Sequence, residues 1–167
     1  GRVGSIAIPQ KRLNGQARTS GFMQAMNEAG IKSADIKQQS TFSDQETYDF
    51  SKVLIAENRD LRAIWLQGSD RYSAALRAIN EAGKKDEILL ATFDAEPEFI
   101  DLIPQGILVG SAMQQPYLMG KEAVIAMDRY LNKQLVEKNK QLPVLAVSTD
   151  NIASKLHITC FRKHIFG

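Results

Sequence analysis

Apolar and polar residues follow one another along this chain in a pattern that predicts strands and helices in regular alternation. Residues 88–93, I-L-L-A-T-F, are apolar or β-branched without a break, which is typical of a strand covered by helices on both faces. We expect strands at residues 3–8, 35–41, 61–67, 87–93 and 107–113, and a sixth apolar run at 142–147. The second strand has mixed polarity and is expected at an edge of the sheet.

Helices are expected between these strands, over residues 14–29, 43–57, 69–82, 97–103 and 116–130. Polar residues that can accept a hydrogen bond from the first helical turn precede three of them, and glycines that suit a left-handed end follow two of them. The expected N-caps are Asn14, Ser43 (in a capping box with Glu46) and Ser69, and the expected stops are Gly30 and Gly83. Pro116 is expected in the first turn of the last helix.

Two of the helices carry an apolar stripe at helical spacing. In the third helix the stripe consists of Tyr72, Leu76, Ile79 and Ala82, and in the fifth of Met119, Ala123, Met127 and Tyr130. Both stripes predict burial against the sheet. Five successive strand-helix units predict an α/β fold, a doubly wound parallel sheet with helices on both faces and right-handed crossovers.

Composition and charge narrow the class of protein. The 167 residues are 44% hydrophobic and 24% charged, as in an ordinary globular domain, and the net charge of +2 is too small to indicate binding to nucleic acid. A single cysteine excludes an intrachain disulfide. Because the chain opens directly on a core strand, we expect it to be a fragment of a longer protein.

Polar and aromatic side chains stand where the predicted strands end. Because the carboxyl ends of parallel strands share one edge of the sheet, these residues are expected close together, at the edge where open α/β sheets bind ligands. Carboxylates, an amide and a guanidinium beside a flat ring suit a polyhydroxylated ligand. The candidates are Arg18, Phe42, Ser69, Asp70, Asp94 and Gln114.

Each candidate also has a purely structural interpretation, which the sequence leaves open. Asp70 could help to cap the third helix, and Asp94 the turn before Pro97. Phe42 could pack under the second helix, Gln114 could satisfy backbone groups, and Arg18 could be a solvated surface residue. Trp65 lies in the middle of a strand and is expected in the core.

Signals for catalysis or for a metal are absent from the sequence. His157, His164 and Cys160 have no metal-ligand spacing, and no dinucleotide fingerprint, phosphate-binding loop or nucleophile elbow occurs. A phosphoacceptor receiver domain is also disfavoured, because the first strand ends in Pro9-Gln10-Lys11 without acidic residues and the fifth ends in Gln114 rather than lysine. We expect a protein that is not an enzyme and needs no cofactor and no metal.

Several segments resemble the periplasmic sugar-binding proteins of the ribose/galactose type. The most specific is Q-G-I-L-V-G-S-A-M-Q-Q-P-Y-L-M-G-K-E-A-V at 105–124, preceded by F-D-A-E-P-E at 93–98. Further matches are N-G-Q-A-R-T-S-G-F at 14–22, Q-G-S-D-R-Y-S-A-A-L-R-A-I at 67–79 and S-T-D-N-I at 148–152.

The resemblance implies a type I periplasmic-binding fold whose two lobes close on the ligand. Residues 1–152 would form the C-terminal, sugar-binding lobe, and residues 153–167 a tail without an assigned role. The family's sugar contacts would fall on Arg18, Phe42, Ser69, Asp94 and Gln114, although the family often has asparagine where Ser69 stands. Phe93 would pack beneath the site.

The function implied is a monomeric, periplasmic or extracellular membrane-associated protein that delivers a sugar to the membrane permease of an ATP-driven transporter. The alternative is a sugar-sensing effector domain of a lactose-repressor-like regulator, which would be cytoplasmic, or of a sensor kinase. In either case this lobe itself would not bind nucleic acid. A flavodoxin-like enzyme is the third hypothesis.

Overall fold

The computed structural model describes residues 1–152 and places six strands in one sheet, in the order β2-β1-β3-β4-β5-β6. The strands are β1 (Arg2–Ala7), β2 (Lys32–Gln38), β3 (Leu61–Leu66), β4 (Leu89–Phe93), β5 (Gly110–Met113) and β6 (Leu145–Ser148). The helices are α1 (Leu13–Glu28), α2 (Asp44–Glu57), α3 (Tyr72–Glu81), α4 (Phe99–Leu102) and α5 (Pro116–Leu131). The expectations for the tail, with His157, Cys160 and His164, lie outside the described residues.

Strands β1 to β5 are parallel, which confirms the α/β sheet predicted from the pattern. Strand β6 departs from it, because it pairs antiparallel with β5. Strand β2 lies at the edge, as its mixed polarity predicts. Strands β4 and β5 start later than predicted, because the N–H groups of Glu87 and Ile88 both bond to the Lys84 carbonyl and those of Ile107 and Leu108 to the Leu102 carbonyl.

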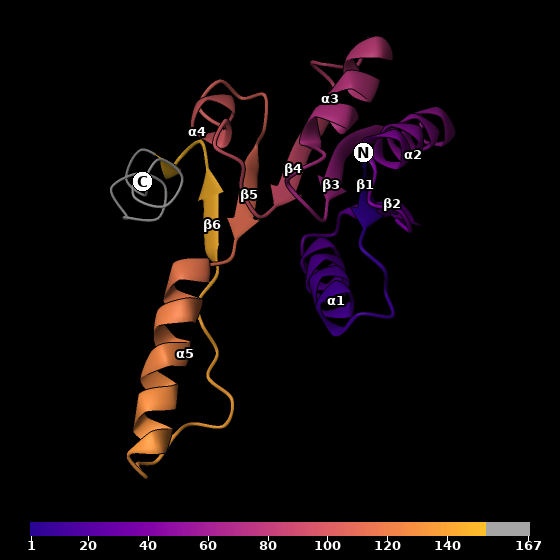
Figure 1. Ribbon diagram of the computed structural model, residues 1–167. Helices are drawn as coiled ribbons and strands as arrows, with labels where there is room; N and C mark the ends of the chain where they lie inside the picture. Colours follow the sequence, from indigo (N-terminus) through magenta and orange to yellow (C-terminus); the bar gives the residue numbers. More distant parts are fainter. Residues whose placement is uncertain (153–167) are drawn as a thin grey trace.

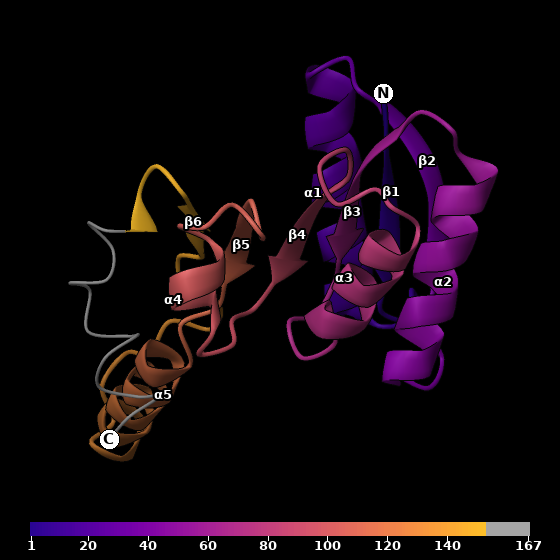
Figure 2. The ribbon, with the colours of Figure 1, turned by 90° about the horizontal axis from the view of Figure 1, so that it is seen from above.

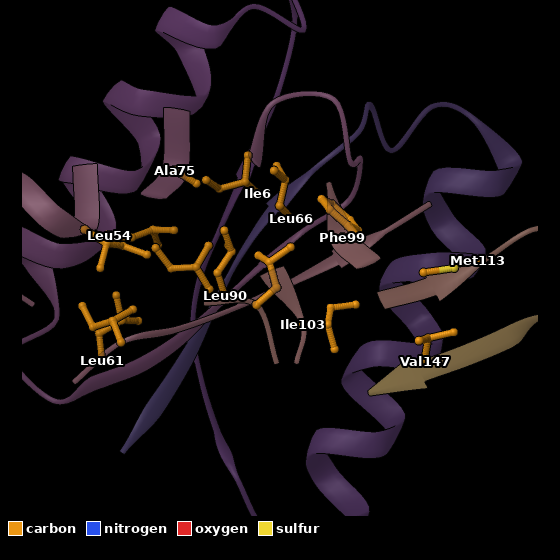
Figure 3. Close-up of a cluster of buried hydrophobic side chains, with 14 of the residues drawn as sticks. Ile6, Leu54, Leu61, Leu66, Ala75, Leu90, Phe99, Ile103, Met113 and Val147 are labelled. Atoms are coloured by element: carbon orange, nitrogen blue, oxygen red, sulfur yellow. The ribbon is translucent and has the colours of Figure 1, made fainter. Parts of the chain in front are cut away.

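The main core lies between one face of the sheet and helices α2, α3 and α4 (Figures 1 and 2). Figure 3 shows side chains of this core, which include Ile6 and Leu66 from the sheet and Leu54, Ala75 and Phe99 from the three helices. Helix α1 covers the opposite face, where the Phe22 ring stacks on the Trp65 ring with centroids 4.5 Å apart. Trp65 is therefore half-buried beneath helix α1 and lies outside the main core in which it was expected.

The helix ends confirm some of the predicted caps and correct others. Ser43 caps α2 by accepting the Glu46 N–H at 3.1 Å, and Gly30 and Gly83 take the left-handed conformation. Asn14 is not a cap, because α1 starts earlier, with Arg12 as its N-cap residue. Ser69 is not one either: a backbone turn from Ser69 to Tyr72 delays the start of α3, whose N-cap is Arg71.

Helix α5 begins with Pro116, as predicted, but the expected buried stripe is wrong. The helix has no buried residue, and Met119, Met127 and Tyr130 are all exposed. Figures 1 and 2 show α5 extending away from the sheet, with the linker to β6 returning beside it.

Candidate functional site

The candidate site lies at the carboxyl edge of the sheet, where β1, β3, β4 and β5 end side by side. The strand register places Leu66 of β3 beside Thr92 of β4, and Phe93 of β4 beside Ala112 of β5. The residues that follow each strand are therefore neighbours at this edge, although they are far apart in the sequence.

Asp94 is the centre of the first cluster. Its Oδ1 accepts a hydrogen bond from Nε2 of Gln114 at 2.9 Å, and its Oδ2 lies 3.9 Å from Nη2 of Arg18. The structure thus brings together three of the predicted site residues, from α1, from the end of β4 and from the end of β5. The interpretation of Asp94 as a cap of the turn before Pro97 is not supported, because the hydrogen bond and the ion pair described for its carboxylate go to Gln114 and Arg18.

Arg18 is held over the ring of Phe93, with Cζ 3.6 Å from the ring centroid. Only 14% of its side chain is exposed, so the alternative interpretation of Arg18 as a solvated surface residue is wrong. Burial lowers the pKa of the Arg18 guanidinium, and the Asp94 carboxylate opposes that shift. Because an arginine remains charged at physiological pH, the edge presents a fixed cation beside a carboxylate. Phe93 packs beneath the site, as the resemblance implies.

Two of the site residues have a strained backbone. Phe42 has φ 55° and Asp94 has φ 67°, in the left-handed region that residues other than glycine rarely adopt. Such strain persists where the surroundings impose it and is concentrated at functional sites. Around Asp94 the surroundings are the Ala112 carbonyl, which accepts the Asp94 N–H, and the Ser111 hydroxyl, which donates to the Asp94 carbonyl.

Around Phe42 the strained loop is held by the carboxylate of Glu46. This carboxylate accepts hydrogen bonds from the backbone N–H groups of Ser40, Thr41 and Phe42 at 2.7 to 3.0 Å. Burial alone raises the pKa of Glu46, but the hydrogen bonds from the backbone and hydroxyl groups of Ser40 and Thr41 outweigh burial and lower the pKa to about 2. Only one half of the predicted capping box is therefore confirmed. The Ser43 hydroxyl accepts the Glu46 N–H, but the Glu46 carboxylate binds the N–H groups of residues 40–42 rather than that of Ser43.

Two guanidinium groups lie near the Phe42 ring. Cζ of Arg12 is 5.3 Å and Cζ of Arg71 is 5.4 Å from the ring centroid. Arg71 is buried: it donates to both carboxylate oxygens of Asp70 at 2.6 Å and to Oε1 of Gln39 at 3.3 Å. The alternative interpretation of Asp70 as a helix cap is not supported, because its carboxylate binds Arg71.

Ser69 is buried at the same edge but engaged within the protein. Its hydroxyl donates to Oε1 of Glu96 at 2.6 Å. The sequence reasoning missed Glu96 and Arg71. The signal for Glu96 was the acidic E-P-E segment directly after Asp94, whereas nothing in the sequence distinguishes the buried Arg71 from a surface arginine.

The arrangement offers hydrogen-bond donors on Arg18 and Gln114, an acceptor on Asp94 and the aromatic ring of Phe42. Within residues 1–152, no cluster of three or more histidine, cysteine or acidic side chains could hold a metal. Over the same range, no helix combines the length and hydropathy that a membrane span needs.

Comparison with known proteins identifies the family to which the chain belongs. Residues 1–135 match a family described as "Periplasmic binding protein domain". The chain is 28% identical over 131 residues to the ribose import binding protein RbsB of Haemophilus influenzae, covering 78% of this chain and 44% of that protein. The chain therefore spans less than half the length of this curated relative. This and other relatives are named as binding proteins, in agreement with the expectation of a protein that is not an enzyme.

Solved structures have the same fold at lower identity. A periplasmic ribose ABC transporter protein from Conexibacter woesei has a TM-score of 0.85 at 19% identity, covering 94% of this chain and 53% of that chain. The fructose-binding periplasmic domain of a hybrid two-component system has a TM-score of 0.80 at 17% identity, covering 99% of this chain and 57% of that chain. At these identities the likeness establishes the fold alone.

Proposed function

The chain belongs to the family of periplasmic binding protein domains, and on that premise we propose that it is one lobe of a solute-binding protein that delivers a sugar to an ATP-driven transporter. The observation that carries the proposal is the Arg18–Asp94–Gln114 cluster at the carboxyl edge of the sheet. The relatives named as ribose and apiose import binding proteins support the same class of ligand.

The chemistry of the cluster suits neighbouring hydroxyl groups on a sugar ring. A carboxylate accepts hydrogen bonds from two hydroxyls, while a guanidinium and an amide donate to the oxygens of the same groups. Phe42, which follows β2 at the same edge of the sheet, is a flat apolar surface on which the carbon face of a sugar would pack. In this assignment Arg18, Asp94 and Gln114 orient the ring, Phe42 stacks on it, and Ser69 lines the edge.

The whole protein would have two lobes that close on the ligand, of which residues 1–152 are the C-terminal one. The chain covers about half of the solved structures it resembles, and helix α5 exposes an apolar face that includes Val124, Met127 and Tyr130. We assign that face to contact with the second lobe. Closure would follow binding because the ligand touches both lobes only in the closed state. The protein would act as a monomer outside the cytoplasm, with a membrane permease as its partner.

A sensor is the second candidate function. It is favoured by the likeness to the fructose-binding periplasmic domain of a hybrid two-component system. Such a sensor would use the same site, so sugar binding alone does not separate the two functions. The residues that adjoin this chain in its gene would separate them, because a membrane helix leading to a kinase domain identifies the sensor.

An amide chemical-shift titration tests the proposal. The ¹⁵N-labelled chain is titrated with D-ribose, D-allose, D-apiose and D-fructose at millimolar concentrations. We expect one or two sugars to shift the amides around Arg18, Asp94 and Gln114, with weak affinity because the second lobe is absent. D94N should weaken binding about 10-fold or more, since it removes the charge of the central acceptor.

The matched control is D86N, an exposed aspartate at the opposite edge of the sheet. It should bind the same sugar with unchanged affinity. The proposal is wrong if no sugar of the panel shifts any amide of the wild-type chain, or if D94N and D86N bind equally well.

A further inference from the structure

A second carboxylate, that of Glu96, stands at the carboxyl edge beside Asp94. It belongs to the same turn, two residues after Asp94, and is half-buried. The turn is fixed at both ends: the Ser111 hydroxyl donates to the Asp94 carbonyl, and the Phe99 N–H donates to the Glu96 carbonyl at 3.0 Å. The position of Glu96 is therefore set by the fold rather than by its own flexible side chain.

The hydrogen bond between Ser69 and Glu96 determines what both groups can offer to a ligand. A serine hydroxyl has one hydrogen, and that of Ser69 is donated to Oε1 of Glu96 at 2.6 Å. The Ser69 oxygen then has only lone pairs to offer, and an ionised carboxylate likewise only accepts. The pair is thus an acceptor-only group at the carboxyl edge of the sheet, formed by residues that follow β3 and β4.

Within residues 1–152 no ion pair involves the Glu96 carboxylate. Arg18 lies beside Asp94, and the guanidinium of Arg71 is occupied by Asp70. Burial raises the pKa of the Tyr72 hydroxyl, and the carboxylates of Glu98 and Glu96 raise it further, as expected where negative charge stays uncompensated. A hydrogen-bond donor from a ligand would meet this charge directly.

We propose that Glu96, held by Ser69, is a specificity-determining residue that accepts a hydrogen bond from one hydroxyl of the bound sugar. The inference rests on the proposed function and adds a statement of which sugars the site accepts. The site requires a donor at that hydroxyl position and rejects sugars in which the hydroxyl is missing. The Ser69–Glu96 pair offers acceptors alone, so it selects for donors.

This requirement predicts how deoxy sugars bind. A ligand without the hydroxyl leaves the desolvated Glu96 carboxylate with the Ser69 hydroxyl but without the donor from the sugar, which weakens binding about 10- to 100-fold. One deoxy isomer of the sugar that binds should therefore be discriminated against in the wild-type chain. In E96Q, whose amide can donate as well as accept, the discrimination at that one position should shrink to about 3-fold or less.

The test compares wild type, E96Q, S69A and D94N with E98Q as the matched control, because Glu98 is an exposed glutamate two residues further on. Each chain is titrated with D-ribose, D-allose, D-apiose and D-fructose, and with the deoxy isomers of the sugar that binds. Side-chain carboxyl ¹³C shifts of Glu96 and Glu98 are followed in the same samples. We expect the sugar to shift the Glu96 carboxyl and not that of Glu98, and E96Q to lose affinity while E98Q keeps it.

The double variant S69A/E96Q should bind as E96Q does, because Ser69 acts through Glu96. The inference is overturned, and the proposed function stands, if D94N loses affinity while E96Q keeps full affinity and unchanged deoxy discrimination, and if the sugar leaves the Glu96 carboxyl of the wild-type chain unshifted. Absence of any sugar binding by the wild-type chain would overturn both. A purely structural Glu96 would lower the urea midpoint of E96Q without changing the preference among deoxy isomers, which also overturns the inference.

Discussion

Helices α3 and α5 have similar apolar stripes in the sequence, but in the structure the stripe of α3 packs on the sheet and that of α5 is exposed. In α3, Ile79 is 1% exposed and packs in the main core. In α5, Met127 is 62% and Tyr130 is 74% exposed. A hydrophobic period therefore identifies a face that is suited to burial, but it does not show that the partner of this face belongs to the same segment of chain.

The connections explain the difference. Helix α3 joins β3 to its parallel neighbour β4, so the chain must cross the face of the sheet and the helix packs on it. Helix α5 joins β5 to β6, which are antiparallel, so the chain returns to the edge it left without crossing a face. The linker after α5 runs back beside the helix instead, where Nε2 of Gln115 donates to the Pro143 carbonyl at 2.8 Å.

The largest expected effect of a substitution lies in α3. I79A removes a buried side chain from the core and leaves a cavity, which should lower the free energy of unfolding by about 2 to 5 kcal/mol. Urea denaturation followed by circular dichroism measures it. A loss below about 1 kcal/mol would mean that α3 is not packed on the sheet, and the contrast with α5 would disappear.

A smaller effect is expected at the start of α2, where a charge rather than an apolar contact fixes the chain. E46Q should cost about 1 to 3 kcal/mol at neutral pH, because the loop at residues 40–42 loses a charged acceptor. The pKa of Glu46 is lowered in the folded protein to about 2. Its contribution is therefore fully present above the pKa of the unfolded chain and is lost as the pH falls through the folded value.

Urea midpoints of wild type and E46Q, measured between pH 7 and pH 2, should converge in the acid range. The control is E137Q, an exposed glutamate in the linker after α5, whose stability should follow that of wild type at every pH. Parallel curves for wild type and E46Q would contradict the assigned role of this carboxylate.

What the sequence predicts at the site depends on how local each feature is. Arg18, Asp94 and Gln114 could be brought together from the sequence, because strand ends of a parallel sheet share an edge whatever the details of the turns. The Ser69–Glu96 bond could not, since it depends on the path of the turn after Asp94. The burial of Arg71 could not be predicted for another reason. It depends on hydrogen bonds to Asp70 and Gln39, whereas most arginines in proteins are exposed.

The fold shows the same division between local and long-range features. The five parallel strands follow from their apolar runs and from the helices between them. The direction of β6 does not, because an apolar run at residues 142–147 has the same pattern in either orientation. The error over α5 has a related cause, since only a connection to a parallel strand requires a helix packed on the sheet, and β6 is antiparallel to β5.

The smallest expected effect lies in α5 and completes the comparison. M127A shortens a side chain that is mostly exposed, and alanine favours a helix, so the free energy of unfolding should change by less than about 0.5 kcal/mol. The matched pair of I79A and M127A, measured under one set of conditions, tests whether two similar stripes carry different energies. A loss in M127A comparable to that in I79A would show that α5 is packed in solution, and it would leave no apolar face for a second lobe.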